Sequence, residues 1–393
     1  MTIRRRHVVY VPGYHPRGAA HYFRLFRGEF ARFGALHGLK TTISRPHALR
    51  DAAYCNWVTE TVGQDWQVET TYELLRWDDV VRADARRPVW RKIATAGLVL
   101  ARYLVSGMYW RMARAHWRFA LFYLYPYLLL LALGAALAGG LVAMLANLAI
   151  QLLLPGHVAV GLALGTVAAI AALAAALRLT EGRTYLLYLF DDAILTDEYV
   201  RRRRPDWDAR LALFADRLIA LAQAADADEI VVVGHSSGSF MAVDVIAQAL
   251  ARDPSLGRRG PVLRLVTLGA NLPLVGFHPA GGWFVERLQR VLAAPGLEWL
   301  DVQSRKDVMS FYPFNQATGH GLAWPGRARP DHIRGAVSRR AAAAELCRLP
   351  LAALPRALPV PDGQRAAGGV GLFHADLRAP RHQRGRGARH GAA

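Results

Sequence analysis

The sequence is poor in cysteine and in lysine. Its 393 residues include two cysteines, Cys55 and Cys347, which excludes a disulfide framework and a cysteine-built metal site and favours a reducing compartment. Three of the 49 basic residues other than histidine are lysines. An arginine excess alongside abundant alanine and glycine is typical of a GC-rich coding sequence. The net charge of +19 is therefore weak evidence for nucleic-acid binding. No helix-turn-helix, zinc-finger or RNA-binding motif accompanies it, and we expect no nucleic-acid partner.

Charge is also absent from one long segment. From Phe119 to Leu177, 59 residues contain no Asp, Glu, Lys or Arg, and the run is interrupted only by Pro155-Gly156-His157. A helix needs about 20 apolar residues to cross a bilayer. We expect a two-helix transmembrane hairpin over residues 119–178, with Pro126 in the first turn of its first helix. A buried hairpin in a soluble protein is the alternative, but no polar stripe is visible.

Arginines flank this segment on both sides, and the turn between its arms has none. By the positive-inside rule, both termini and the catalytic domain are expected in the cytoplasm. A run of four arginines, Arg201 to Arg204, follows the segment. It fits either a lipid-headgroup clamp or, more simply, a solvated charged face.

The rest of the chain alternates between strand and helix patterns. Strands are predicted at 7–11, 68–77, 230–233, 262–268 and 297–303, and helices at 20–36, 207–224 and 238–250. The segment 185–190 fits a strand or a helix start. This order predicts an α/β domain with a mostly parallel sheet flanked by helices. The hairpin would split that domain into parts 1–118 and 179–325, followed by a basic, disordered tail at 326–393.

The motif with chemical content is Gly234-His235-Ser236-Ser237-Gly238, which directly follows the apolar run Glu229–Val233. A strand enters the motif and a helix of small and apolar residues leaves it, as a nucleophile elbow requires. Ser236 would sit in a strained turn with its hydroxyl above the sheet. Gly234 and Gly238 would allow the close packing around it, and the Ser237 N–H would face a developing oxyanion.

These residues resemble the α/β-hydrolase superfamily, on its lipase and esterase side, over about residues 7–310 without the hairpin. The resemblance implies a second oxyanion donor after the first strand, the Tyr14 N–H. It also implies a catalytic acid after a later strand. Asp307 is the choice, because Lys306-Asp307-Val308-Met309, ending in Gly319-His320-Gly321, is similar to a segment of fungal-type triglyceride lipases. Asp301 competes, but it lies within the predicted strand.

The catalytic histidine is the main departure from that pattern. His320 and His332 are the candidates for the base. By the lipase resemblance His320 occupies a place that is usually structural, and no clear strand precedes His332. Beyond about residue 330 the apolar periodicity fades and arginine, alanine, proline and glycine accumulate. This tail is either a basic segment that contacts anionic lipid or a reading frame shifted by one base, and sequencing the locus distinguishes the two.

The expected function is therefore a membrane-anchored serine hydrolase that cleaves an acyl ester, with a membrane lipid as the natural substrate class. Two alternatives stay open. One is an inactive hydrolase-like binding protein in the membrane, and the other is an acyltransferase on the same fold. No metal-ligand spacing, P-loop or dinucleotide fingerprint is present, so neither a cofactor nor a metal is expected.

Overall fold

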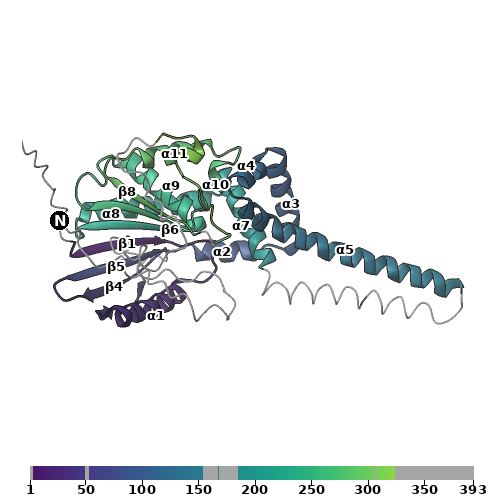
Figure 1. Ribbon diagram of the computed structural model, residues 1–393, viewed down its shortest axis with the longest axis horizontal. Helices are drawn as coiled ribbons and strands as arrows, with labels where there is room; N and C mark the ends of the chain where they lie inside the picture. The colour runs from purple at the N-terminus through teal and green to yellow at the C-terminus, as the bar shows by residue number, and fades with distance from the viewer. Residues whose placement is uncertain (1–2, 49–52, 154–166, 168–184, 305–306, 324–393) are drawn as a thin grey trace, which may run out of the picture.

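The computed structural model describes residues 3–48, 53–153, 167, 185–304 and 307–323. These residues form an α/β domain around one eight-stranded sheet, from which a single long helix projects (Figure 1). The strands are β1 (Arg5–Val11), β2 (Lys40–Ile43), β3 (His47–Ala48), β4 (Tyr54–Val62), β5 (Gln67–Leu75), β6 (Glu229–His235), β7 (Val262–Leu268) and β8 (Leu297–Val302). The predicted α/β class with a mostly parallel sheet is confirmed.

The sheet has the order β2-β4-β5-β1-β6-β7-β8, with β3 paired to β4. The five strands from β5 to β8 are parallel, whereas β2, β3 and β4 pair antiparallel at one edge. The sequence analysis missed these three edge strands. β1 pairs with β6, so strands from both sides of segment 119–178 join one sheet.

Helices cover both faces of the sheet. They are α1 (Ala19–His37), α2 (Asp78–Ala85), α3 (Val89–Val105), α4 (Met108–Ala115), α5 (Trp117–Leu153), α7 (Leu186–Val200), α8 (Pro205–Ala224), α9 (Ser237–Arg252), α10 (Leu272–Gly276) and α11 (Gly282–Leu292), with a 3₁₀ turn at Thr318–His320. The predicted helices correspond to α1, α8 and α9. The segment 185–190 is helical and opens α7.

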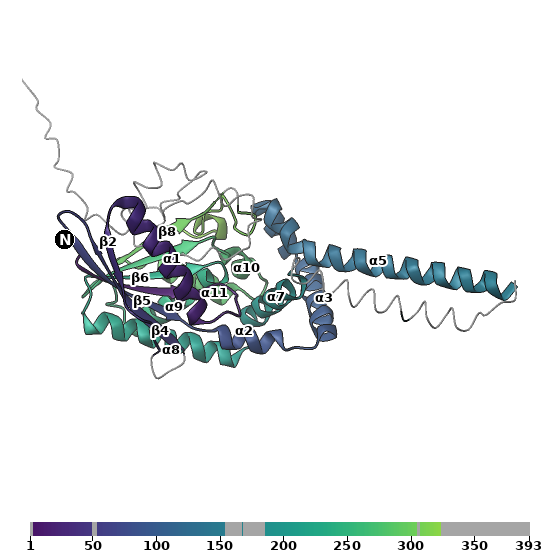
Figure 2. The same cartoon turned by 90° about the horizontal axis from the view of Figure 1, so that it is seen from below.

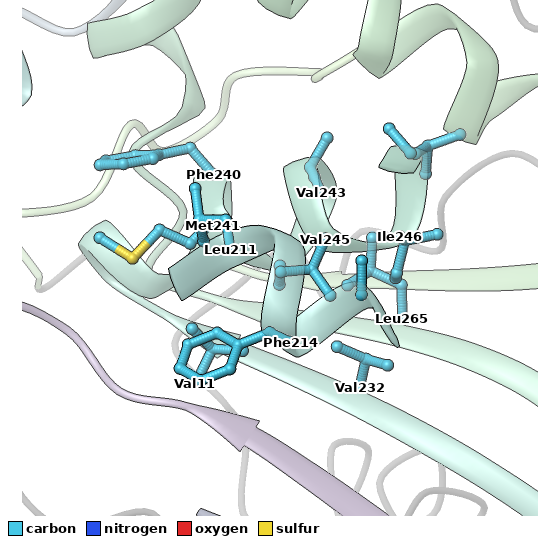
Figure 3. Close-up of a cluster of buried hydrophobic side chains, with 14 of the residues drawn as sticks. Val11, Leu211, Phe214, Val232, Phe240, Met241, Val243, Val245, Ile246 and Leu265 are labelled. Atoms are coloured by element: carbon cyan, nitrogen blue, oxygen red, sulfur yellow. The ribbon is translucent and has the colours of Figure 1, made fainter. Parts of the chain in front are cut away.

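The core follows the two-residue period of the strands. Val9 and Val11 of β1 face α8 and α9, whereas Val8 and Tyr10 face α1. Apolar side chains of α8 and α9 pack together against Val11, Val232 and Leu265 of the sheet (Figure 3). Both faces of β1 and β6 are therefore buried, which holds their carboxyl ends rigidly in the middle of the sheet.

The long helix α5 differs from the expected hairpin. It begins at Trp117, so Pro126 lies well inside it rather than in its first turn. The first turns pack on the domain through the buried Phe119 and Ala120. Pro126 itself is also buried, so the turn that lacks the proline N–H lies against the domain. The expected second arm, 158–177, lies outside the described residues.

Beyond these first turns α5 extends away from the domain (Figures 1 and 2). The stretch Trp117–Val142 has a mean hydropathy of 1.9, and 11% of it is buried. From Leu128 to Leu153 the helix is roughly 39 Å long at 1.5 Å per residue. One helix in the described part of the chain is thus long and apolar enough to cross a membrane.

Candidate active site

Ser236 occupies a strained turn between β6 and α9. Its backbone has φ 53° and ψ −124°, an uncommon conformation for a residue with a side chain. The turn is tight on both sides. A Cβ at Gly238 would lie 2.2 Å from the Val11 carbonyl oxygen, and one at Gly234 would lie 2.7 Å from the Gly238 carbonyl oxygen. Glycine is therefore required at both positions, and the serine is held in the elbow geometry.

The loop after β1 lies directly against this serine. A Cβ on Gly13 would be 3.0 Å from Ser236 Cβ and 3.6 Å from its Oγ. After β1 the chain continues to the β5 side of the sheet, and after β6 it continues to the β7 side. The loops that follow these two neighbouring strands therefore meet where the strand order reverses. In open α/β sheets, this crevice at the carboxyl ends of the strands is where ligands bind.

Side chains from other elements fix the loop after β1. The Trp77 indole N–H donates to the Pro12 carbonyl at 3.1 Å, and the Tyr188 hydroxyl donates to the Tyr14 carbonyl. The Tyr14 ring lies between those of Trp77 and Tyr188, with centroids 5.9 and 5.3 Å away. The backbone of Tyr14 is thereby positioned beside Ser236. Ser237 is the first residue of α9, where a backbone N–H has no acceptor within its own helix.

Asn271 is a site residue that the sequence analysis missed. Its Nδ2 donates a hydrogen bond to Ser236 Oγ at 3.2 Å. It stands just after β7, and its own N–H donates to the hydroxyl of Ser239 at 3.0 Å. That hydroxyl in turn donates to the Ser236 carbonyl at 2.5 Å. The sequence offered one signal for Asn271: it is a polar residue just after the strand next to the elbow strand. The carboxyl ends of parallel neighbouring strands meet at one edge of the sheet.

Asp307 lies at the same edge of the sheet. A Cβ on Gly269, which follows β7, would be 3.2 Å from Asp307 Oδ2. The Ser236 N–H donates to the Leu268 carbonyl at 2.9 Å. Ser236 and the Asp307 carboxylate therefore lie against two adjacent residues, Leu268 and Gly269. Burial raises the pKa of Asp307, opposed by a hydrogen bond from the Met309 N–H at 2.9 Å.

The competing carboxylate is engaged elsewhere. Asp301 is fully buried within β8 and accepts hydrogen bonds from Thr267 at 2.7 Å and from Gln316 at 3.0 Å. Gln303 supplies a third at 2.6 Å. A carboxylate held by three donors ties β7, β8 and the following loop together, which is a structural task.

The described histidines do not complete a triad. His320 hydrogen-bonds through Nδ1 to the Gln316 carbonyl at 2.7 Å, and its ring fills the space over Gly276. His15 and His235 lie near the elbow, and burial lowers the pKa of each to about 4. His15 Nδ1 accepts the Arg17 N–H at 3.2 Å, so its neutral ring carries the proton on Nε2. His332 lies outside the described residues.

A narrow apolar cavity of about 30 Å³ adjoins the site at the foot of α5. Its wall combines two site residues, Asn271 and Asp192, with Met309 and the first turns of α5. The Asp192 carboxylate accepts the Ser237 hydroxyl at 3.1 Å, and burial raises its pKa to about 6. The membrane-capable helix therefore shares this wall with Asn271, the residue that hydrogen-bonds Ser236.

Buried ion pairs position α7 behind this cavity. Lys92 of α3 contacts Asp191 with Nζ 2.5 Å from the carboxylate, and both side chains are at most 5% exposed. Arg204 pairs with Asp84 at 2.9 Å and with Glu198 at 3.2 Å. Arg204 is thus an internal anchor, and the interpretation of Arg201–Arg204 as a solvated face or a headgroup clamp is wrong at this residue.

No protein-family model matches this sequence, and no curated protein or solved structure matches it. Within the described ranges, no cluster of three or more His, Cys, Asp or Glu side chains could hold a metal ion. Any statement about function therefore rests on the geometry of the serine elbow and its surroundings.

Proposed function

We propose that this protein is a membrane-anchored serine hydrolase that cleaves an acyl ester, with Ser236 as the nucleophile. The observation that carries the proposal is the strained turn of Ser236 between β6 and α9, flanked by Gly234 and Gly238, where a Cβ would clash with the backbone. A strained backbone at a serine that follows a central strand is typical of a nucleophile elbow. The elbow and the loop after β1 are the arrangement expected of an α/β-hydrolase.

The proposed reaction begins with attack of Ser236 Oγ on the acyl carbonyl carbon while the hydroxyl proton passes to an imidazole. The N–H groups of Ser237 and Tyr14 hold the resulting oxyanion. The ester C–O bond then breaks, and the alcohol leaves with the proton from the imidazole. Water attacks the acyl-enzyme carbonyl carbon and passes a proton to the imidazole. The acyl C–Oγ bond then breaks, the imidazole returns the proton to Ser236 Oγ, and the acid leaves.

Asp307 is proposed to orient that imidazole, because it lies at the same sheet edge and is bonded locally by the Met309 N–H, whereas Asp301 is held by three donors in the core. The imidazole is assigned to His332, which lies outside the described residues, because the other candidate, His320, packs over Gly276. His320 is the second candidate: its Nδ1 donates to a carbonyl, which leaves Nε2 unprotonated. Its position over Gly276 supports a structural role instead.

The substrate class follows from α5. A helix that can span a bilayer supplies part of the cavity beside Asn271, so an ester drawn from the membrane would reach the site along that helix. The cavity is too narrow for an acyl chain, so we expect α5 or the Phe122 side chain to shift when one enters. We also propose the two-span topology with both termini in the cytoplasm, supported by the flanking arginines.

A lipid-binding protein without turnover is the second candidate. It is favoured by one observation: among the described residues, the recorded hydrogen-bond partner of Ser236 Oγ is the Asn271 amide. An amide N–H donates and cannot accept a proton. An acyltransferase would use the same residues as the hydrolase, with an alcohol in place of water.

The test is ester cleavage by the full chain reconstituted in vesicles that contain a fluorescent diacylglycerol or phospholipid. We expect release of fatty acid that Ser236→Ala abolishes. Ser255→Ala is the matched control, because Ser255 lies in the loop beyond the far end of α9 and bonds Asp253. Release that survives Ser236→Ala, or lipid binding without any release, would reject the hydrolase.

A further inference from the structure

Helix α3 presents an apolar face to its surroundings instead of to the domain. Trp90, Leu98 and Val105 are 66%, 63% and 90% exposed. The positions between them on the same face are also exposed and uncharged, namely Ala94, Gly97, Ala101 and Leu104. The opposite face, with Val99 and Tyr103, is buried against the domain. A soluble surface helix shows the reverse pattern, so this face requires an apolar partner.

The exposed charges in this part of the chain are basic. From Arg86 to Arg118 the chain has eight basic residues and no acidic ones. Three of them, Arg87, Lys92 and Arg102, pair with carboxylates of other elements, and the other five are exposed arginines. Arg91 stacks over Trp90 at 5.2 Å, and Arg118 stacks over Trp117 at 5.5 Å. Trp110, on the adjoining α4, is 56% exposed. Exposed tryptophan and arginine beside an apolar helix face are typical of a helix lying in the interface of an anionic bilayer.

The placement of α3 agrees with this environment. Tyr103 near its C-terminal end stacks on Tyr123 of α5 at 5.6 Å, which fixes α3 at the foot of the projecting helix. Figure 2 shows α3 running across the direction of α5, at the end of the domain from which α5 leaves. If α5 follows the membrane normal, α3 lies along the membrane surface.

We propose that the face of α3 formed by Trp90, Ala94, Leu98, Ala101 and Val105 rests in the headgroup region of an anionic lipid bilayer. The face then acts as a platform that holds the mouth of the cavity against the membrane. The proposal rests on the membrane anchoring proposed for α5 and is independent of catalysis by Ser236. A lipid surface is favoured over a protein partner because apolar residues, tryptophans and arginines continue without a break into α5.

The test compares single cysteines, each carrying an environment-sensitive fluorophore, in the full chain with Cys55 and Cys347 replaced. The protein is reconstituted in phosphatidylcholine vesicles containing 30% phosphatidylglycerol. The labelled variants are Leu98→Cys, Leu131→Cys within α5, and Leu36→Cys on α1. Leu36 is the matched control, since it is 63% exposed like Leu98 but lies on the other side of the sheet from α8 and α9. Quenching is measured with headgroup-labelled nitroxide lipid, with deep acyl-chain nitroxide lipid and with aqueous iodide.

We expect headgroup nitroxide to quench the label at position 98 at least threefold more than that at 36, and iodide to show the opposite order. The label at 131 should respond to the deep nitroxide. If the deep nitroxide quenches the label at position 131 but iodide quenches the label at 98 as strongly as that at 36, the platform is refuted while the anchor stands. If 98 is shielded from all three quenchers, a protein covers the face and the proposal is wrong. If 131 is also quenched by iodide, both the anchor and the platform are refuted, whatever the esterase assay shows.

Discussion

Asn271, which follows Gly269 and Ala270 after the end of β7, donates a hydrogen bond from Nδ2 to Ser236 Oγ at 3.2 Å. The contact joins the elbow to α10 and to the wall of the cavity. In the proposed mechanism this donor to Oγ leaves the Oγ–H of Ser236 to point toward the base. Asn271 is thus a positioning residue in the proposed mechanism.

Asn271→Ala should slow acylation of Ser236 without abolishing it. Loss of one neutral hydrogen bond is worth about 0.5–1.5 kcal/mol, which corresponds to roughly 2- to 13-fold in rate. The measurement is the labelling rate with a fluorophosphonate probe. Asn271→Asp separates orientation from simple space filling, because a carboxylate has the same shape but accepts instead of donating. A rate equal to wild type in both variants would show that the contact has no such role.

Asp307→Asn should lower the acylation rate by on the order of 10³-fold or more, the usual effect of losing the group that orients a catalytic imidazole. Asp301→Asn should act through stability instead, since Asp301 accepts three hydrogen bonds in the core. Labelling rate and unfolding temperature, measured on both variants, separate the two effects. An Asp307→Asn protein that labels normally would remove Asp307 from the site.

The two histidine candidates make opposite predictions. His332→Ala should abolish labelling, whereas His320→Ala should retain it and lower the unfolding temperature, because the His320 ring packs on Phe314 and over Gly276. The same labelling assay decides, with circular dichroism as the check on folding. The reverse pattern would move the base to His320.

Two glycine-to-alanine substitutions are expected to change the stability of the protein in opposite directions. Gly238→Ala would place a Cβ 2.2 Å from a backbone oxygen, so we expect loss of several kcal/mol or failure to fold. Gly28→Ala is the control in the middle of α1, where a Cβ meets nothing within 4 Å. That change should stabilise the protein by about 0.5–1 kcal/mol. Thermal unfolding of the two variants checks the pair, and a tolerant Gly238 would contradict the tight elbow.

The buried carboxylate of Asp192 predicts a pH effect. Its pKa in the folded protein is about 6 against an ordinary 3.8, so the folded state binds the extra proton between these values. This group therefore costs stability increasingly as pH rises from about 4 to about 6, and fully above that range. Asp192→Asn should be stabilising by on the order of 2 kcal/mol at pH 7 and by little at pH 4. Unfolding temperatures of both proteins at these pH values test this, and a pH-independent difference would argue against it.

The strands and the elbow were predictable because they depend on local pattern. His7–Val11 and Glu229–Val233 are short apolar runs that end in glycine-containing turns, as buried parallel strands do. The strand β4 was not predicted because its apolar residues alternate with Thr, Glu and Asn, a pattern that fits a polar loop equally well. Its identity depends on pairing with β5, which sequence spacing does not reveal.

The environment of α7 could not be predicted, since its partners are distant in sequence. Asp191 and Asp197 look solvated in the sequence, yet both are buried because Lys92 and Arg102 reach them from α3. Asn271 escaped attention for a similar reason. Its position after the strand next to the elbow strand was a signal, but its contact with Ser236 depends on the approach of three chain segments, which that position alone does not specify.

The measurement that tests the central claim most directly is the location of a fluorophosphonate adduct by peptide mass spectrometry on the full chain in membranes. The account predicts one modified peptide, with the phosphonate on Ser236 and not on Ser237 or Ser239, and no adduct in Ser236→Ala. An intact, folded protein that carries no adduct on Ser236 would contradict the hydrolase assignment.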